Sequence, residues 1–136
     1  MAWKWWKPKD DPLKNKYVHE LEDSIEAIDE ETDQRDTSFV ELDASAKRNV
    51  LYSFLEIGET LKSIDDNPEV DTEGLPNDDS RKWRHLRNRI AHDPVEVKDN
   101  HQYVQQHIED LSELDEQLDD YWLENVPEEE SVEEDR

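Results

Sequence analysis

The segment from Arg81 to His92 combines imidazole, amide and guanidinium side chains at helical spacing. Four polar residues follow one another at intervals of four, three and four, which places them on one face of a helix: Arg81, His85, Asn88 and His92. The opposite face holds the apolar residues of the segment: Trp83, Leu86 and Ile90. The polar set can bind a phosphate and move protons without a metal ion.

Arg87 and His92 form an Arg-x4-His pair within this segment. On a regular helix Arg87 lies about 140° from His92, nearer the apolar face. It therefore needs its length, a frayed helix end or a second subunit to reach the same phosphate. His92 lies at the expected C-terminus of the helix, where the helix dipole favours the imidazolium and general-acid chemistry. The spacing alone is unspecific, and its context must carry the argument.

The charge of the chain is uneven. Asp and Glu number 39 against 16 Lys and Arg, which gives a net charge of −23 and argues against a generic nucleic-acid binder. Yet residues 81–89 hold five of the 16 cations, and residues 4–16 hold another five. Intramolecular ion pairs would account for the basic helix, and so would a polyanionic ligand. Charge alone does not choose between them.

Composition excludes several classes of protein. The absence of cysteine excludes disulfides, thiolate metal sites and a cysteine nucleophile, and two glycines are too few for a phosphate-cradling loop. No apolar run is long enough to span a membrane, and residues 1–8 do not resemble a signal peptide. We therefore expect a cytoplasmic protein with no cofactor and no metal. Asp and Glu are in excess within the expected helices as well as in the tail. This distribution favours a halophilic source over an ordinary acidic domain with an acidic tail.

Apolar residues at intervals of three and four predict four main helices, at about 17–31, 44–64, 79–91 and 100–122. Asp43 is expected to cap the second of them, Gly58 to mark a close helix–helix approach, and Pro94 to end the third near His92. We predict an all-α, antiparallel bundle with a thin core that a dimer interface would complete. The expected divisions are an irregular arm, a helical domain and a disordered acidic tail, at 1–16, 17–124 and 125–136.

Three segments resemble one known family. RHLRNRIAHD at 84–93 resembles the Arg-Asn-x3-His signature of the HEPN superfamily, and the same segment begun at Trp83 resembles the HepT-like toxins. NVLYSFLEIGETLKSI at 49–64 resembles the central helix of that subfamily, and YVHELEDSIEAIDE at 17–30 resembles its first helix. The resemblance covers about residues 17–120, with the helices in the family's order.

The resemblance implies a metal-independent endoribonuclease, the toxin of a toxin–antitoxin pair. In such enzymes two protomers join so that both Arg/His motifs line one cleft. By position, Arg87 would stabilise the phosphate, Asn88 would orient the phosphate or the base, and His92 would act as acid or base. The remaining polar residues of the helix are candidates for RNA binding: Arg81, Arg84, His85 and Arg89. His85 enters this set through helical geometry and not through the family pattern.

One position departs from the family. HepT-like toxins typically carry a tyrosine two residues after the motif histidine, and a partner nucleotidyltransferase antitoxin adenylylates it; here the position is Pro94. Neutralisation by simple binding, or a HEPN protein that no longer serves as a toxin, are the alternatives. A catalytically silent module that binds RNA or protein, and a purely structural acidic dimerisation domain, are the competing functions. The Trp- and Lys-rich stretch at 3–9 suits base stacking, a membrane interface, a partner or the protein's own core.

Overall fold

The computed structural model describes residues 12–70, 72, 74–76 and 80–125. The tryptophan-rich stretch of the predicted arm, and the predicted acidic tail beyond Asn125, lie outside these residues. The described residues form helices and no strand, with these bounds: α2 Pro12–Glu31, the 3-10 helix η2 Phe39–Glu41, α3 Ala44–Asp66, α4 Ser80–His92, α5 Pro94–Asp99 and α6 His101–Asn125. The predicted all-α class is confirmed.

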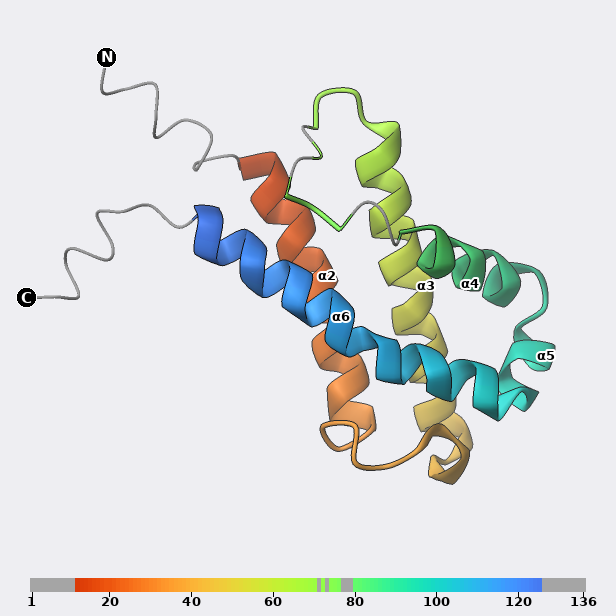
Figure 1. Ribbon diagram of the computed structural model, residues 1–136. Helices are drawn as coiled ribbons and strands as arrows, with labels where there is room; N and C mark the ends of the chain where they lie inside the picture. The colour runs from red at the N-terminus through yellow and green to blue at the C-terminus, as the bar shows by residue number, and fades with distance from the viewer. Residues whose placement is uncertain (1–11, 71, 73, 77–79, 126–136) are drawn as a thin grey trace, which may run out of the picture.

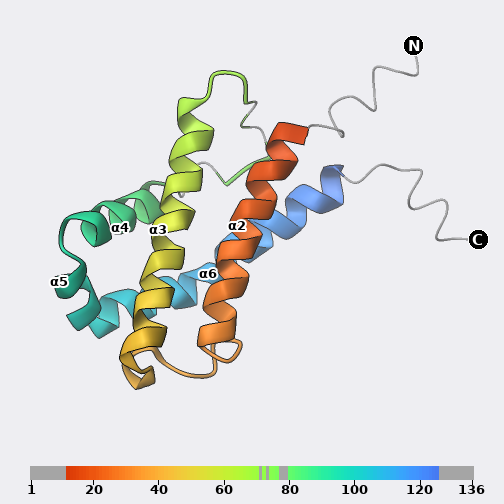
Figure 2. The same cartoon turned by 180° about the vertical axis from the view of Figure 1, so that it is seen from behind.

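The helices α2 and α3 lie side by side and run in opposite directions (Figure 1). The long helix α6 crosses them obliquely, and Figure 2 shows it behind them when the molecule is turned round. The helix α4 packs against α3, and the short α5 links it to α6. One apolar core joins these elements, with members from each of them.

The first helix begins at Pro12, so the prediction of an irregular arm through residue 16 was wrong for residues 12–16. Proline suits the first position of a helix, where its fixed φ is already helical and its missing N–H has no intrahelical acceptor. The added turn also packs: Lys14 is buried, with its ammonium 5.9 Å from the centroid of the Tyr121 ring. The Tyr121 hydroxyl donates a hydrogen bond of 2.6 Å to Asn15 Oδ1, which ties the start of α2 to the end of α6.

The two signals predicted for α3 are both present. Asp43 is its N-cap, and the carboxylate accepts a hydrogen bond of 2.8 Å from the Ala46 N–H. Gly58 lies where α4 comes closest: a Cβ there would overlap the Arg87 Cβ and lie 3.0 Å from the Trp83 carbonyl oxygen. The missing side chain therefore lets α4 pack directly on α3.

The helix α4 ends at His92, as the following proline predicted. The helix α5, which was not predicted, begins directly after α4. Asp93 caps it by accepting a 3.2 Å hydrogen bond from the Glu96 N–H, and Pro94 takes the first helical turn. Asp93 and Pro94 therefore end α4 and also begin α5.

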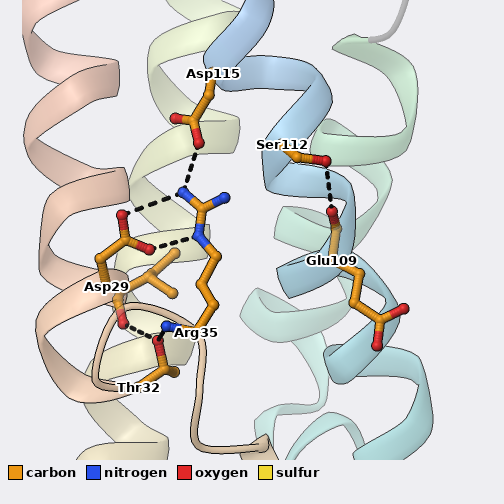
Figure 3. A network of polar contacts seen from close by, with 7 residues as sticks. Asp29, Thr32, Arg35, Glu109, Ser112 and Asp115 are labelled. Atoms are coloured by element: carbon orange, nitrogen blue, oxygen red, sulfur yellow. Dashed lines mark hydrogen bonds and ion pairs between the residues drawn. The ribbon is translucent and has the colours of Figure 1, made fainter.

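The turn after α2 is held by an ionic cluster around Arg35 (Figure 3). Asp33, Gln34 and Arg35 all have positive φ, an uncommon backbone for side-chain-bearing residues. The Arg35 guanidinium donates to Asp29 at 2.6 and 3.2 Å and to Asp115 of α6 at 2.7 Å. We call Asp29, Arg35 and Asp115 the Arg35 cluster; it joins the end of α2 to α6.

Candidate functional site

The apolar face of α4 packs against aromatic side chains of α3 and α6. Trp83, Leu86 and Ile90 are buried, as predicted. The Trp83 ring stacks on Phe54 of α3 with centroids 6.0 Å apart, and it meets His107 of α6 edge-on at 5.6 Å. These contacts fix the rotation of α4 about its axis, and so decide which of its side chains face outwards.

His107 is a buried histidine among these aromatic side chains. Its Nδ1 donates to the Tyr103 carbonyl oxygen at 2.9 Å, which leaves Nε2 without the proton in the neutral ring. Desolvation by burial lowers the pKa of His107, against the opposing effect of this hydrogen bond. The imidazole under α4 is therefore a neutral packing group.

The polar face of α4 is turned to solvent along its whole length. Each of the four residues predicted to share it is exposed: Arg81, His85, Asn88 and His92. A helix rises about 1.5 Å per residue, so His85 lies about 10 Å along the axis from His92. The two imidazoles of one chain are too far apart to act on one phosphate.

A hollow of about 210 Å³ lies where α4 meets α5. Its lining residues come from the end of α4 and the start of α5: Asn88, Arg89, His92, Asp93, Glu96 and Val97. Pockets that enclose a small ligand usually measure roughly 300–1,000 Å³, so this hollow is too small to enclose a whole ligand of that kind. Two predicted catalytic residues and one predicted RNA-binding residue thus surround one hollow.

Arg89 is held at the rim of this hollow from two sides. Its Nη2 lies 3.2 Å from Glu96 Oε1, and its guanidinium lies 4.4 Å from the centroid of the Tyr103 ring. The stacking orients the guanidinium and leaves its edges available for hydrogen bonds. An incoming phosphate would compete with Glu96 alone, because the aromatic contact does not occupy a donor.

Arg87 lies on the flank of α4, outside the lining of the hollow, as its angle on the helical wheel predicts. Its guanidinium pairs with Glu59 of α3 and donates from Nη1 to Asn88 Oδ1 at 2.8 Å. Arg87 therefore touches the site through Asn88. The structure does not bring Arg87 and His92 of one chain to a common point.

Most cations of α4 have acidic partners in their own chain. Four of them are paired: Lys82 with Asp110 and Glu113, Arg84 with Asp65, Arg87 with Glu59, and Arg89 with Glu96. Arg81 has no ion pair with any described residue. Intramolecular ion pairs therefore account for part of the positive charge of the basic helix. The side chains in these pairs are all at least 19% exposed.

Three partners of the site were not predicted. Glu59, Glu96 and Tyr103 lie on α3, α5 and α6, and each becomes a neighbour of α4 only through the packing of helices. With 39 carboxylates in the chain, no spacing distinguishes Glu59 or Glu96 from the rest. For Tyr103, the sequence gives no signal of its place beneath Arg89.

Among residues 12–70, 72, 74–76 and 80–125, no three His, Asp or Glu side chains cluster closely enough to hold a metal ion. In the same part of the chain, no helix combines the length and the apolar character needed to cross a bilayer.

Comparisons of the chain with protein-family models, with curated proteins and with solved structures find no match. A function for this chain can therefore be inferred only from the site and from the resemblance of the motif segment.

Proposed function

We propose that this chain is a metal-independent endoribonuclease of the HEPN type and that it works as a homodimer. The observation that carries the proposal is the hollow at the α4–α5 junction, where Asn88, Arg89 and His92 meet and Arg87 is bonded to Asn88. The proposal includes an antiparallel arrangement of the helical bundle and a dimer formed through the α4 side.

The reaction needs an acid, a base and a cation. The RNA 2′-hydroxyl loses its proton and attacks the adjacent phosphorus, the bond to the 5′-oxygen breaks, and that oxygen takes up a proton. Arg89 and Arg87 would offset the charge that develops on the phosphoryl oxygens. His92 would supply one of the proton transfers, because an imidazole can give or take a proton near neutral pH.

A second copy of the chain would supply the other imidazole. One chain offers His92 at the hollow, and its His85 lies about 10 Å away along α4. Two α4 helices facing each other would bring two His92 side chains and two Arg87 side chains to one cleft. A homodimer therefore resolves both the spacing of the histidines and the distance between Arg87 and His92.

The first experiment measures cleavage of fluorescently labelled RNA in 2 M KCl with EDTA. We expect His92→Ala and Arg87→Ala each to lower the rate by about 10²–10⁴-fold, since each removes a group required in the transition state. The matched control is His19→Ala, which removes an exposed histidine on α2 and should leave the rate unchanged. Circular dichroism and light scattering must show that each variant is folded and dimeric. Cleavage that persists in His92→Ala, or that EDTA abolishes, contradicts the mechanism.

A silent RNA- or protein-binding module is the second candidate. The observation that favours it is the pairing of four α4 cations with carboxylates of their own chain. A module of this kind would bind labelled RNA without shortening it, and His92→Ala would bind as tightly as the unmodified chain. Binding and cleavage measured on the same RNA separate the two functions.

The biological role proposed is that of a toxin, with a cognate nucleotidyltransferase as antitoxin. With Pro94 in the position of the modified tyrosine, neutralisation would proceed by binding. A nucleotidyltransferase gene found beside this one would support the pairing. Growth arrest on expression, relieved by that neighbour and lost in His92→Ala, is the expected result.

The acidic surface is proposed to serve a cytoplasm at high salt. At about 1 M salt the Debye length is roughly 3 Å, so repulsion among exposed carboxylates is largely screened. The test is a thermal melt in 0.1 M and in 2 M KCl. We expect the chain to be more stable in 2 M KCl, and equal stability at both concentrations would argue for an ordinary acidic domain.

A further inference from the structure

Tyr103 lies next to the α4–α5 hollow without lining it, in the first turn of α6, which follows α5 directly (Figure 1). Its half-buried ring carries the Arg89 guanidinium, whose Cζ atom lies 4.4 Å from the ring centroid. The other cations found over aromatic rings in the described part of the chain are lysine ammonium groups at 5.5–6.0 Å. The closest contact of this kind thus involves a cation that lines the hollow.

The Tyr103 hydroxyl takes no part in this arrangement. Its oxygen is buried and has no hydrogen-bond partner among the described residues. A buried hydroxyl without a partner costs free energy and does not hold a side chain in place. The contribution of Tyr103 to the site therefore comes from its ring, which phenylalanine would also supply.

The ring of Tyr103 is held by His107, one helical turn further along α6. The two rings meet edge to face, with centroids 4.7 Å apart and planes at 68°. His107 is itself buried, and its Nδ1 donates a 2.9 Å hydrogen bond to the Tyr103 carbonyl oxygen. Burial lowers the pKa of His107, so this neighbour adds no positive charge beside Arg89 at neutral pH. Arg89 is therefore stacked on a ring whose own position is fixed.

This stacking prepares Arg89 for an anion. A ring contact covers one face of the guanidinium and uses none of its five N–H donors. The carboxylate of Glu96 accepts from Nη2 alone, at 3.2 Å, and its side chain is 63% exposed. An arginine that is already held in place loses less conformational freedom when it binds a phosphate.

We infer that Tyr103 is a positioning residue for RNA binding, whose ring holds the Arg89 guanidinium so that it can bind a phosphate of the RNA in place of Glu96. The inference rests on the proposed function, because it requires RNA to bind at the α4–α5 junction. Tyr103 lies outside the lining of the hollow and acts through Arg89, so its effect must disappear when Arg89 is removed.

The experiment measures the Kd for a fluorescent 2′-O-methyl RNA, at the lowest KCl concentration that keeps the native circular dichroism. This RNA lacks the attacking 2′-hydroxyl, so the Kd does not depend on cleavage. We expect Tyr103→Leu to raise the Kd at least about fivefold, and Tyr103→Phe less than about twofold, because phenylalanine keeps the ring. In an Arg89→Ala background, Tyr103→Leu should change the Kd less than about twofold.

The matched control is Tyr17→Leu, which removes another partly buried tyrosine with a cation over its ring, the Lys16 ammonium at 6.0 Å. Tyr17 lies on α2, which contributes nothing to the lining of the hollow, so the Kd should stay within about twofold. Three results would overturn the inference: an unchanged Kd in Tyr103→Leu, an equal rise with and without Arg89, or an equal rise in Tyr103→Phe.

A second measurement needs no RNA and no leucine variant, and so decides the case even if Tyr103→Leu does not fold. Protons above the face of an aromatic ring resonate upfield, so the NMR signals of the Arg89 δ-methylene, assigned with Arg89→Lys, should be shifted upfield. The shift should persist in Tyr103→Phe and in Glu96→Gln. Its absence from the unmodified chain, or its loss in Glu96→Gln, would overturn the inference.

The two proposals fail in different ways. An unmodified chain that shows the upfield shift but neither binds nor cleaves RNA would overturn the proposed function and this inference with it. A chain that binds and cleaves RNA without the upfield shift would overturn the role of Tyr103 alone.

Discussion

The Arg35 cluster and the basic helix α4 contain ion pairs of the same length, but the pairs are built differently. Arg35 Nη2 lies 2.7 Å from Asp115 Oδ2, and Arg84 Nη1 lies 2.7 Å from Asp65 Oδ2. Arg35 also donates two bonds to Asp29, whereas Arg84 has one carboxylate partner. Arg84 therefore engages fewer donors than Arg35, although their 2.7 Å bonds are equal in length.

The surroundings of the two arginines differ in the same direction. Burial alone would lower the pKa of Arg35, but the hydrogen bonds to Asp29 and Asp115 raise it above its usual value. The side chain of Arg35 is 23% exposed and that of Arg84 is 38% exposed. Water therefore screens the Arg84 guanidinium more than the Arg35 guanidinium, whereas the carboxylates are ordered the other way, with Asp115 39% and Asp65 25% exposed.

The largest effect on stability is expected for Arg35→Met. The substitution removes three charge-assisted hydrogen bonds and leaves Asp29 and Asp115 facing each other without a cation. We expect the free energy of unfolding to fall by about 2–3 kcal/mol. Urea denaturation in 2 M KCl measures it, since urea does not change the ionic strength. A loss below about 0.5 kcal/mol would place Arg35 with the exposed pairs and remove the contrast.

Gly58→Ala tests whether α4 is held by packing instead of by its ion pairs. The new methyl group would overlap the Arg87 Cβ and approach the Arg87 Cγ to 2.8 Å, so α3 and α4 must separate. Overpacking of this kind costs about 1–3 kcal/mol, and the better helix propensity of alanine returns up to about 1 kcal/mol. We expect a net loss of about 1–2 kcal/mol in urea denaturation. Ser63→Ala, at an exposed position of α3, is the control and should be neutral or slightly stabilising.

The close approach of α3 and α4 at Gly58 illustrates which features of the fold can be predicted from the sequence. The helix bounds, the Asp43 cap and the close approach at Gly58 follow from signals within a few residues, namely apolar spacing, a capping side chain and a missing Cβ. The early start at Pro12 and the helix α5 were missed because each depends on a proline, and a proline both ends and begins helices.

The candidate site divides in the same way. Helical geometry alone predicted the exposed face of α4 and the separation of Arg87 from His92. The partners of Arg87 and Arg89 could not be predicted, because Glu59 and Tyr103 reach α4 from other helices. For the same reason the Arg35 cluster could not be predicted, since Asp115 lies 80 residues along the chain from Arg35.

A smaller effect, on pH dependence, is expected at His107. Burial lowers the pKa of His107 below its ordinary 6.5, so the folded chain keeps this ring neutral where the unfolded chain already takes up a proton. By linkage, its contribution to stability is fully present above pH 6.5 and is lost as the pH falls below that value. We expect unfolding free energies at pH 7.5 and 5.5 to differ more in the unmodified chain than in His107→Phe. If the two chains show the same difference between pH 7.5 and 5.5, His107 is protonated in the folded state, and the contact between α4 and α6 carries a charge, as the Arg35 cluster does.

The smallest effect on stability, and the sharpest test of the comparison, is expected for Arg84→Met. It is matched to Arg35→Met in chemistry and in the 2.7 Å bond that it breaks, but it removes one exposed pair with Asp65. We expect a change within about 0.5 kcal/mol in urea denaturation. If α4 binds RNA as proposed, the same variant should bind labelled RNA more weakly while its fold is unchanged, because Arg84 can exchange Asp65 for a phosphate. A loss of stability equal to that of Arg35→Met would instead make the cations of α4 structural, and would leave Arg81 as the one cation of this helix without a carboxylate partner among the described residues.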